Sequence, residues 1–122
     1  MKVYYAHSMA SYNTKVEKRD VNLIRSLGYE IVNPSSKDIE QKLKKHRKKS
    51  DNDMDFFRTL VESCDILFFR ALPNGKITSG VAIEIVHARM CNKPILEIPS
   101  GMLHRTLSRD ETVEYLKDVG NR

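Results

Sequence analysis

The feature that most constrains the fold is a continuous apolar run, Asp65 to Phe69 (DILFF), in which every residue after the first is hydrophobic. A strand of this kind, without polar alternation, is typical of a sheet that is covered on both faces. Three further short runs rich in β-prone residues occur elsewhere in the chain. The four predicted strands span residues 2–6, 29–32, 65–69 and 94–98.

The segments between these runs carry the signals of helices. Thr14 can cap a helix that Gly28 ends, and Ser36 can cap a short helix that we expect to dissolve into the lysine-rich stretch behind it. Aspartates over residues 51–55 precede the apolar residues of a third helix, where they would favour its N-terminus. The remaining predicted elements are a helix over residues 79–91, a short strand over 103–107 and a final helix over 108–119.

Strands that alternate with helices in this way predict an α/β fold with a parallel sheet and right-handed crossovers. We expect one domain over residues 1–122, with a flavodoxin-like three-layer fold and four or five strands in the order 2-1-3-4-5. In that order, ligands bind beyond the carboxyl ends of the strands. Three loops should meet there, over residues 6–13, 72–80 and 99–104.

The formal net charge of +5 comes from one segment. Six of the 21 basic residues lie in a stretch that contains no acid, so the other basic residues nearly balance the 16 acidic ones. The six are Lys42, Lys44, Lys45, Arg47, Lys48 and Lys49. Such a run is usually a solvated helix face or loop, and contact with the phosphate of a substrate or polynucleotide is the alternative. No stacking aromatics interleave with the lysines, so nucleic acid is not the expected partner.

Several protein classes are excluded by what the sequence lacks. The histidines and cysteines do not approach zinc-ligand spacing and no G-x-G-x-x-G occurs, so we expect no metal and no redox cofactor. Cys64 and Cys91 are expected to be buried or half-buried thiols. No stretch approaches the roughly 20 apolar residues of a membrane span. The N-terminal MKVYYAHSM is too short and polar for a secretory signal, so we expect a cytoplasmic protein.

The segment from Asp65 to Ser100 concentrates the residues that can do chemistry. Thr78, Ser79 and Gly80 precede a helix, whose exposed amides and dipole would favour an anion, and the glycine permits close approach of a ligand to the backbone. Glu84 follows within an otherwise apolar helical stretch. A carboxylate in such surroundings is costly unless it is paired or used.

This segment resembles the nucleoside 2-deoxyribosyltransferase family, in which an Asp-led strand is followed by a loop, small residues, a helical glutamate and a Lys-Pro before the next strand. The N-terminal motif over residues 3–9 is also similar to that family, and the likeness in topology covers most of the chain. The resemblance implies that Glu84 is a nucleophile that attacks C1′ of the sugar and that Tyr4 orients it. The alternatives are a solvent-facing Glu84 bonded to Arg89 or Lys93, and a Tyr4 that only packs in its strand.

Where the transferases often carry an aspartate, this chain has Thr78. In the related 2′-deoxynucleoside 5′-phosphate N-hydrolases a small hydroxyl residue stands there and helps to hold the 5′-phosphate. Ser8 likewise matches a phosphate-contacting serine of those hydrolases, with a loop cap as its alternative role. The resemblance therefore favours a nucleoside monophosphate over a free nucleoside, bound by Ser8, Thr78, Ser79 and Gly80.

Two other positions match the family less well. Asp55 is the nearest candidate for the aspartate that handles the leaving group, but its distance in sequence from Asp65 is longer than usual and it can equally serve the helix start. His7 replaces a common glycine and could contact base or phosphate, or titrate near neutrality. Together with Met9 it is predicted to belong to the substrate-binding loop.

These residues predict cleavage or transfer at the N-glycosidic bond of a nucleotide or nucleoside. The alternatives are a nucleotide-binding or signalling module without turnover, with a ligand as large as an NAD-like dinucleotide, and a basic nucleic-acid-binding protein. The family resemblance also implies a homo-oligomer in which the segment with Ser100, Met102 and His104 completes a neighbouring site. The base, the sugar and the acceptor stay open.

Overall fold

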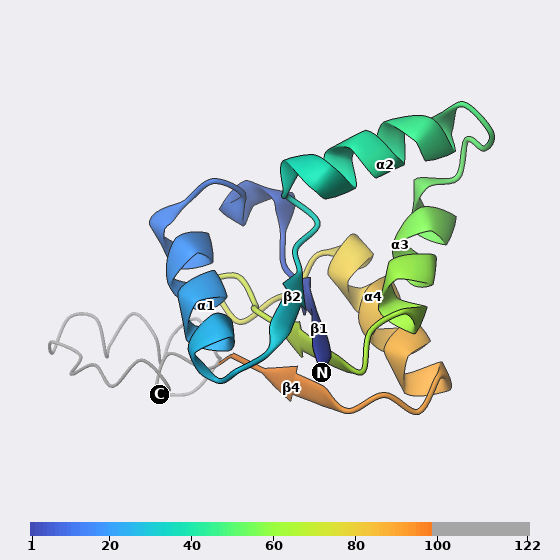
Figure 1. Cartoon of the computed structure of the whole chain (residues 1–122). Coiled ribbons are helices and arrows are strands. Elements are labelled where there is room, and N and C mark those ends of the chain that lie inside the picture. The colour runs from blue at the N-terminus through green and yellow to red at the C-terminus, as the bar shows by residue number, and fades with distance from the viewer. Residues whose placement is uncertain (99–122) are drawn as a thin grey trace, which may run out of the picture.

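The computed structural model describes residues 1–98 (Figure 1). Its elements are β1 (Lys2–Ala6), the 3-10 helix η1 (Met9–Ser11), α1 (Lys15–Ser26), β2 (Glu30–Val32), α2 (Lys37–Arg47), α3 (Asp53–Glu62), β3 (Ile66–Phe69), α4 (Ser79–Met90) and β4 (Ile95–Glu97). The predicted strand over residues 103–107, the final helix and the loop over 99–104 lie outside the described residues.

The four strands form one parallel sheet in the order β2-β1-β3-β4. The central strands pair in a register that places Tyr4 beside Leu67 and Ala6 beside Phe69. This α/β fold confirms the first four positions of the predicted strand order and is compatible with a flavodoxin-like fold.

Helices cover both faces of the sheet. Figure 1 shows α1 on one face and α3 with α4 on the other, while α2 lies beyond the carboxyl ends of the strands. Each face has its own core, in which Ile24 of α1 packs on one side and Ile85 of α4 on the other. Tyr4 faces α4 and Tyr5 faces α1, and both side chains are fully buried. Both tyrosines therefore face a core, because the sheet is covered on both sides.

The predicted helix starts are confirmed by their caps. The hydroxyl of Thr14 accepts a hydrogen bond from the amide of Glu17, and that of Ser36 accepts one from Ile39. At the start of α3 the cap is Asn52, next to the acidic residues of the first turn. Such caps satisfy amides that the helix itself leaves without partners.

The prediction that the second helix dissolves in the lysine run is wrong, since α2 continues to Arg47. Lysine is a good helix former, and cations near the C-terminus of a helix interact favourably with its dipole. Arg47 also binds Asp53 at the start of α3 through two hydrogen bonds, of 3.1 and 2.7 Å. The six basic residues of the run are all exposed, as expected for a solvated face.

β4 is covered less completely than the central strands β1 and β3. Ile95 is only partly buried, and Leu96 and Glu97 are exposed. Within residues 1–98, β4 is an edge strand that pairs with β3 alone. Edge strands are covered less completely than central ones, and an apolar sequence by itself does not reveal that position.

None of the helices within residues 1–98 is long and apolar enough to cross a membrane. The longest, α1 and α4, have 12 residues each. A membrane-spanning helix needs roughly 20 residues.

Candidate functional site at the carboxyl edge of the sheet

A cavity of about 300 Å³ opens at the carboxyl edge of the sheet. The loop that follows β1 contributes His7, Ser8 and Met9 to its lining. The start of α4 contributes Thr78, Ser79, Gly80 and Glu84. Seven of the nine predicted site residues are therefore brought together around this space, which we call the Glu84 cavity.

Glu84 is buried, with 7% of its surface exposed, and it accepts a hydrogen bond from the hydroxyl of Tyr4. Tyr4 reaches it from the central strand β1, so the two side chains meet between the sheet and α4. The contact expected between these residues is present. Lys93 instead donates to the backbone carbonyl of Glu62, at 3.0 Å, so it is not a partner of Glu84.

Burial raises the pKa of Glu84 from its ordinary value of 4.5 to about 7, although the hydrogen bond from Tyr4 acts in the opposite direction. The N-terminus of α4 does not offset this effect of burial. Glu84 lies in the second turn of α4, and the effect of a helix dipole fades beyond the first turn. Near neutral pH the site holds the carboxyl in both its protonated and its ionised form.

The phenol of Tyr4 is a fixed donor. Burial, together with the charge of Glu84 and the hydrogen bond to it, raises the Tyr4 pKa well above its ordinary value. Tyr12, which also lines the cavity, has its pKa raised to about 12, first by burial and then by the charge of Glu84. Both phenols thus stay neutral and can donate hydrogen bonds at physiological pH.

His7 holds the loop after β1 in place. Its Nδ1 lies 3.1 Å from the carbonyl oxygen of Tyr5 and its Nε2 lies 2.6 Å from Oε2 of Glu17. Its ring also stacks on the Tyr5 ring, with centroids 3.8 Å apart. Because the protein already engages both ring nitrogens, the structure does not support the predicted contact between His7 and a base or phosphate.

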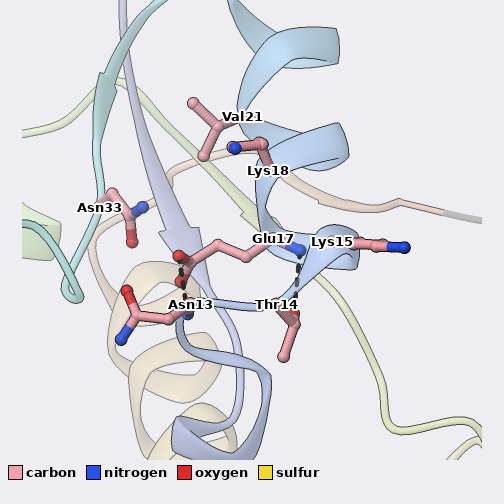
Figure 2. A pocket seen from close by; sticks show the side chains of 7 residues that line it. All are labelled: Asn13, Thr14, Lys15, Glu17, Lys18, Val21 and Asn33. Carbon is pink, nitrogen blue, oxygen red and sulfur yellow. Dashed lines mark hydrogen bonds between the residues drawn. The ribbon is translucent and has the colours of Figure 1, made fainter.

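Glu17 connects this loop to its surroundings. Figure 2 shows its carboxylate accepting from the Asn13 amide, at 3.1 Å, while its own amide donates to Thr14. Ser35 donates to the same carboxylate at 2.7 Å. Burial acts to raise the Glu17 pKa, but hydrogen bonds from His7, Ser35 and Asn13 outweigh it and lower the pKa. Glu17 is therefore held in its ionised form. It also lines a second, more open hollow of about 450 Å³.

A buried polar cluster, which the sequence did not reveal, stabilises the opposite face of β1. Tyr5 donates to Asp20 of α1 at 2.6 Å, and Arg70 binds the same carboxylate through two hydrogen bonds, of 2.5 and 2.8 Å. Asp20 is fully buried. Its place on the apolar face of an amphipathic helix was the signal that could have identified it, because a charge there needs a partner.

The N-terminus of α4 differs from those of the other described helices. Thr78 is its N-cap residue but makes no side-chain cap hydrogen bond, and its first turn contains no acid. The caps of α1, α2 and α3 all accept such a bond, and all three first turns contain acids. Thr78, Ser79 and Gly80 therefore line the cavity from a helix start that carries no acid of its own, and Glu84 follows in the second turn.

Ser8 and Met9, which were predicted to bind substrate, both lie in the loop after β1. The hydroxyl of Ser8 accepts from the Ala10 amide at 3.2 Å and so caps η1, which leaves its own proton available to a ligand. Met9 is 78% exposed and lies at the rim of the cavity. At Gly80 an added Cβ would meet nothing within 4 Å, so the space beside this residue is open.

Asp55 does not line the cavity. It lies on the exposed surface of α3, where it pairs with Arg58 at 3.1 Å, so its place is the helix start. Met54 and Phe57 of the same helix do reach the cavity, and Tyr12 and Pro34 complete its lining. Sequence reasoning missed these four, because Met54 and Phe57 belong to an amphipathic helix whose apolar residues suggest a core, while Tyr12 and Pro34 lie outside the regular helices and strands and carry no distinctive signal.

Asp65 has a structural role at the other edge of the sheet. Its carboxylate accepts from the backbone amide of Lys2 at 2.8 Å. This contact joins the beginnings of β1 and β3, away from the carboxyl ends where the Glu84 cavity opens.

Comparison with known protein families and with curated proteins finds no match to this chain.

Proposed function

We propose that this chain cleaves or transfers at the N-glycosidic bond of a nucleoside 5′-monophosphate, or of a nucleoside, with Glu84 as the nucleophile. The observation that carries the proposal is a buried carboxyl that lines a cavity and is held by a tyrosine hydroxyl. This arrangement is what the resemblance to the nucleoside 2-deoxyribosyltransferase family implies for Glu84 and Tyr4. A flavodoxin-like assignment of the whole chain, with a fifth strand, belongs to the same proposal.

In the proposed reaction the ionised Glu84 attacks C1′ and a carboxylate oxygen forms an ester with the sugar. The electron pair of the C–N bond leaves with the base, which takes up a proton from water. Water, or a second base, then attacks C1′ and releases the carboxylate. Tyr4 positions the attacking group by binding its Oε2, which leaves the other carboxylate oxygen available for attack.

The start of α4 supports a phosphorylated substrate. The hydroxyls of Thr78 and Ser79 and the amides of the first turn line the cavity, and no acid in that turn repels an anion. Ser8 lies on the wall formed by the loop after β1. A phosphate dianion gains charge-assisted hydrogen bonds in such a position.

Another part of the lining is suited to a planar base. Met54 and Phe57 come from α3, and Tyr12 comes from the loop after η1. Aromatic and thioether groups offer a flat ligand both apolar area and stacking contacts. We therefore place the base toward α3 and the phosphate toward the start of α4, with the sugar at Glu84.

The test is release of free base from a panel of nucleoside monophosphates and nucleosides, followed by chromatography. Glu84→Gln and Glu84→Ala are expected to abolish release. Glu30→Gln, which alters an exposed glutamate at the start of β2, is the matched control and should retain it. Intact-mass measurement with a 2′-fluorinated arabino-nucleotide should show a sugar-phosphate adduct in the wild type alone, because the fluorine slows breakdown of the ester.

Other results would contradict the proposal in distinct ways. Tight nucleotide binding without base release from any substrate would favour a binding or signalling module. Equal release by wild type and both Glu84 variants would remove Glu84 from the mechanism. Faster turnover of nucleosides than of their monophosphates would leave the nucleophile in place and overturn the phosphate assignment.

A further inference from the structure

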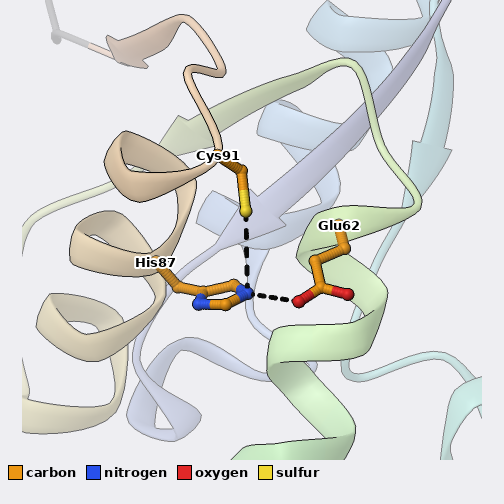
Figure 3. A group of neighbouring side chains, drawn as sticks. All are labelled: Glu62, His87 and Cys91. Carbon is orange, nitrogen blue, oxygen red and sulfur yellow. Dashed lines mark hydrogen bonds and ion pairs between the residues drawn. The ribbon is translucent and has the colours of Figure 1, made fainter.

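A second group of potential ligands lies at the far end of α4 from Gly80. Figure 3 shows His87, in the last turns of α4, and Cys91, the C-cap of the same helix. Both side chains point toward Glu62, the last residue of α3. The three ligand atoms lie within 4.8 Å of one another. Among residues 1–98, this is the one group of three such side chains that could hold a metal ion.

We propose that Glu62, His87 and Cys91 form a binding site for a divalent transition-metal ion, with Zn²⁺ as the best match. Thiolate, imidazole and carboxylate are the three protein ligands that zinc uses, and three ligands leave a fourth position for water. Magnesium and calcium prefer oxygen ligands alone, so the cysteine and histidine disfavour them. The site is separate from the proposed glycosyl chemistry at Glu84.

The three ligand atoms lie within 4.8 Å of one another and can reach tetrahedral spacing if the Glu62 carboxylate moves, away from His87 and toward Cys91. Tetrahedral zinc, with bonds of about 2.0 to 2.3 Å, sets its ligand atoms about 3.3–3.7 Å apart. Cys91 Sγ and His87 Nε2 are already 3.8 Å apart. His87 Nε2 and Glu62 Oε1 are 2.8 Å apart, so the carboxylate must retreat by about half an ångström. The Glu62 side chain is 54% exposed and is free to make this movement.

This site corrects the expectation that no histidine and cysteine approach metal-ligand spacing. His87 and Cys91 are four residues apart, which places both on one face of a helix. The third ligand comes from a helix 25 residues away in sequence, so only the packing of α3 against α4 reveals it. On binding, the thiol releases its proton to solvent, and the imidazole binds through an unprotonated Nε2.

The neighbouring charges are mixed. Lys93 donates to the carbonyl of Glu62 and adds a positive charge on the solvent side. The three ligands supply two negative charges when the thiol is ionised, so the net local charge still favours a divalent cation. A bound ion would join the C-terminal ends of α3 and α4, far from the mouth of the Glu84 cavity.

The test uses the untagged full chain, freed of metal and titrated with Zn²⁺ against a chromophoric chelator. We expect about one zinc ion per chain, as for a single three-ligand site. Cobalt should give the intense visible bands of a tetrahedral ion and a thiolate charge-transfer band in the near ultraviolet. Zinc should also raise the melting temperature, since it binds the folded state selectively.

Cys91→Ser, His87→Gln and Glu62→Gln are each expected to weaken zinc binding at least about tenfold. Cys91→Ser should also abolish the cobalt–thiolate band. His46→Gln is the matched control, because it alters a histidine outside the cluster and should bind zinc as the wild type does. These substitutions are conservative and lie near the surface, and circular dichroism checks that each variant folds.

Two results would overturn the proposal. The first is zinc binding no tighter in the wild type than in the three variants. The second is cobalt binding with octahedral spectra and no thiolate band, which would show that Cys91 is not a ligand. In either case Glu62 and His87 would form only a surface ion pair.

Discussion

At the scale of single residues, the behaviour of Glu84 depends on two opposing influences. Burial favours its neutral form, and the Tyr4 hydroxyl favours its charged form. If Glu84 attacks as a carboxylate, base release should rise with pH through about 7. A pH profile of kcat/KM measures this ionisation in the free enzyme, and a profile that is flat between pH 5 and 9 would contradict it.

Tyr4→Phe should shift that profile. Removing the hydroxyl takes away the one interaction that lowers the Glu84 pKa, so the rising limb should move to higher pH. The rate at high pH should fall as well, because the carboxylate loses its orienting partner. Tyr29→Phe, which changes a tyrosine of the α1 face, is the control and should leave the limb in place. An unshifted limb in Tyr4→Phe would remove Tyr4 from this role.

The same carboxyl should make stability depend on pH. Between its ordinary pKa of 4.5 and about 7, the folded state keeps a proton that the unfolded chain has released. The free energy of unfolding should therefore fall as the pH rises through this range, by up to about 3 kcal/mol. Glu84→Gln removes the ionisation, so its stability relative to wild type should be greatest at pH 8 and smallest at pH 5. Urea unfolding at both pH values measures the difference, and a constant difference would contradict it.

At the scale of elements, the start of α4 combines a helix glycine with open space. Gly80→Ala should stabilise the fold by about 0.5–1 kcal/mol, because alanine is the better helix former and its Cβ meets nothing. If a phosphate occupies that space, the same change should raise KM for a nucleoside monophosphate. Thermal unfolding and kinetics separate the two effects. A higher melting temperature with unchanged KM would place the phosphate elsewhere.

The face of β1 opposite Glu84 depends on Asp20. Asp20→Ala should cost about 3–5 kcal/mol, because it leaves Arg70, which is half-buried, and Tyr5 without their shared partner. Asp55→Ala, on the exposed surface of α3, should cost less than about 1 kcal/mol. Denaturant unfolding compares the two directly. Equal losses would mean that the buried cluster contributes little to stability.

At the scale of the whole molecule, the strand order and the meeting of two predicted loops could be read from the sequence. Alternating strands and helices restrict the topology, and parallel strands bring the residues after β1 and before α4 to one edge. This is why the sequence alone groups Ser8 with Thr78, whereas the place of Glu84 in the site was implied by the family resemblance.

The remaining features depend on packing between segments distant in the sequence. Phe57 turns toward the cavity, and Asp20 pairs with Arg70 at a separation of 50 residues. The partners of His7 and the pKa of Glu84 follow from burial. Periodicity gives the face of a helix, but it does not say what the face meets. Asp55 was matched to the family's leaving-group aspartate by its place in the sequence, but in the structure it pairs with Arg58 on the surface of α3.

The two adjacent tyrosines of β1 have a consequence for strand pairing. Successive side chains of a strand point to opposite faces, so a slip of β1 by one residue against β3 would turn each tyrosine to the other face. Depending on its direction, the slip would bring Val3 into the place of Tyr4 or Ala6 into the place of Tyr5, so either Glu84 or Asp20 would lose its hydroxyl donor. The two hydrogen bonds together therefore favour one register of the central strands, since a slip in one direction would break the contact to the candidate nucleophile and a slip in the other would break the contact to Asp20.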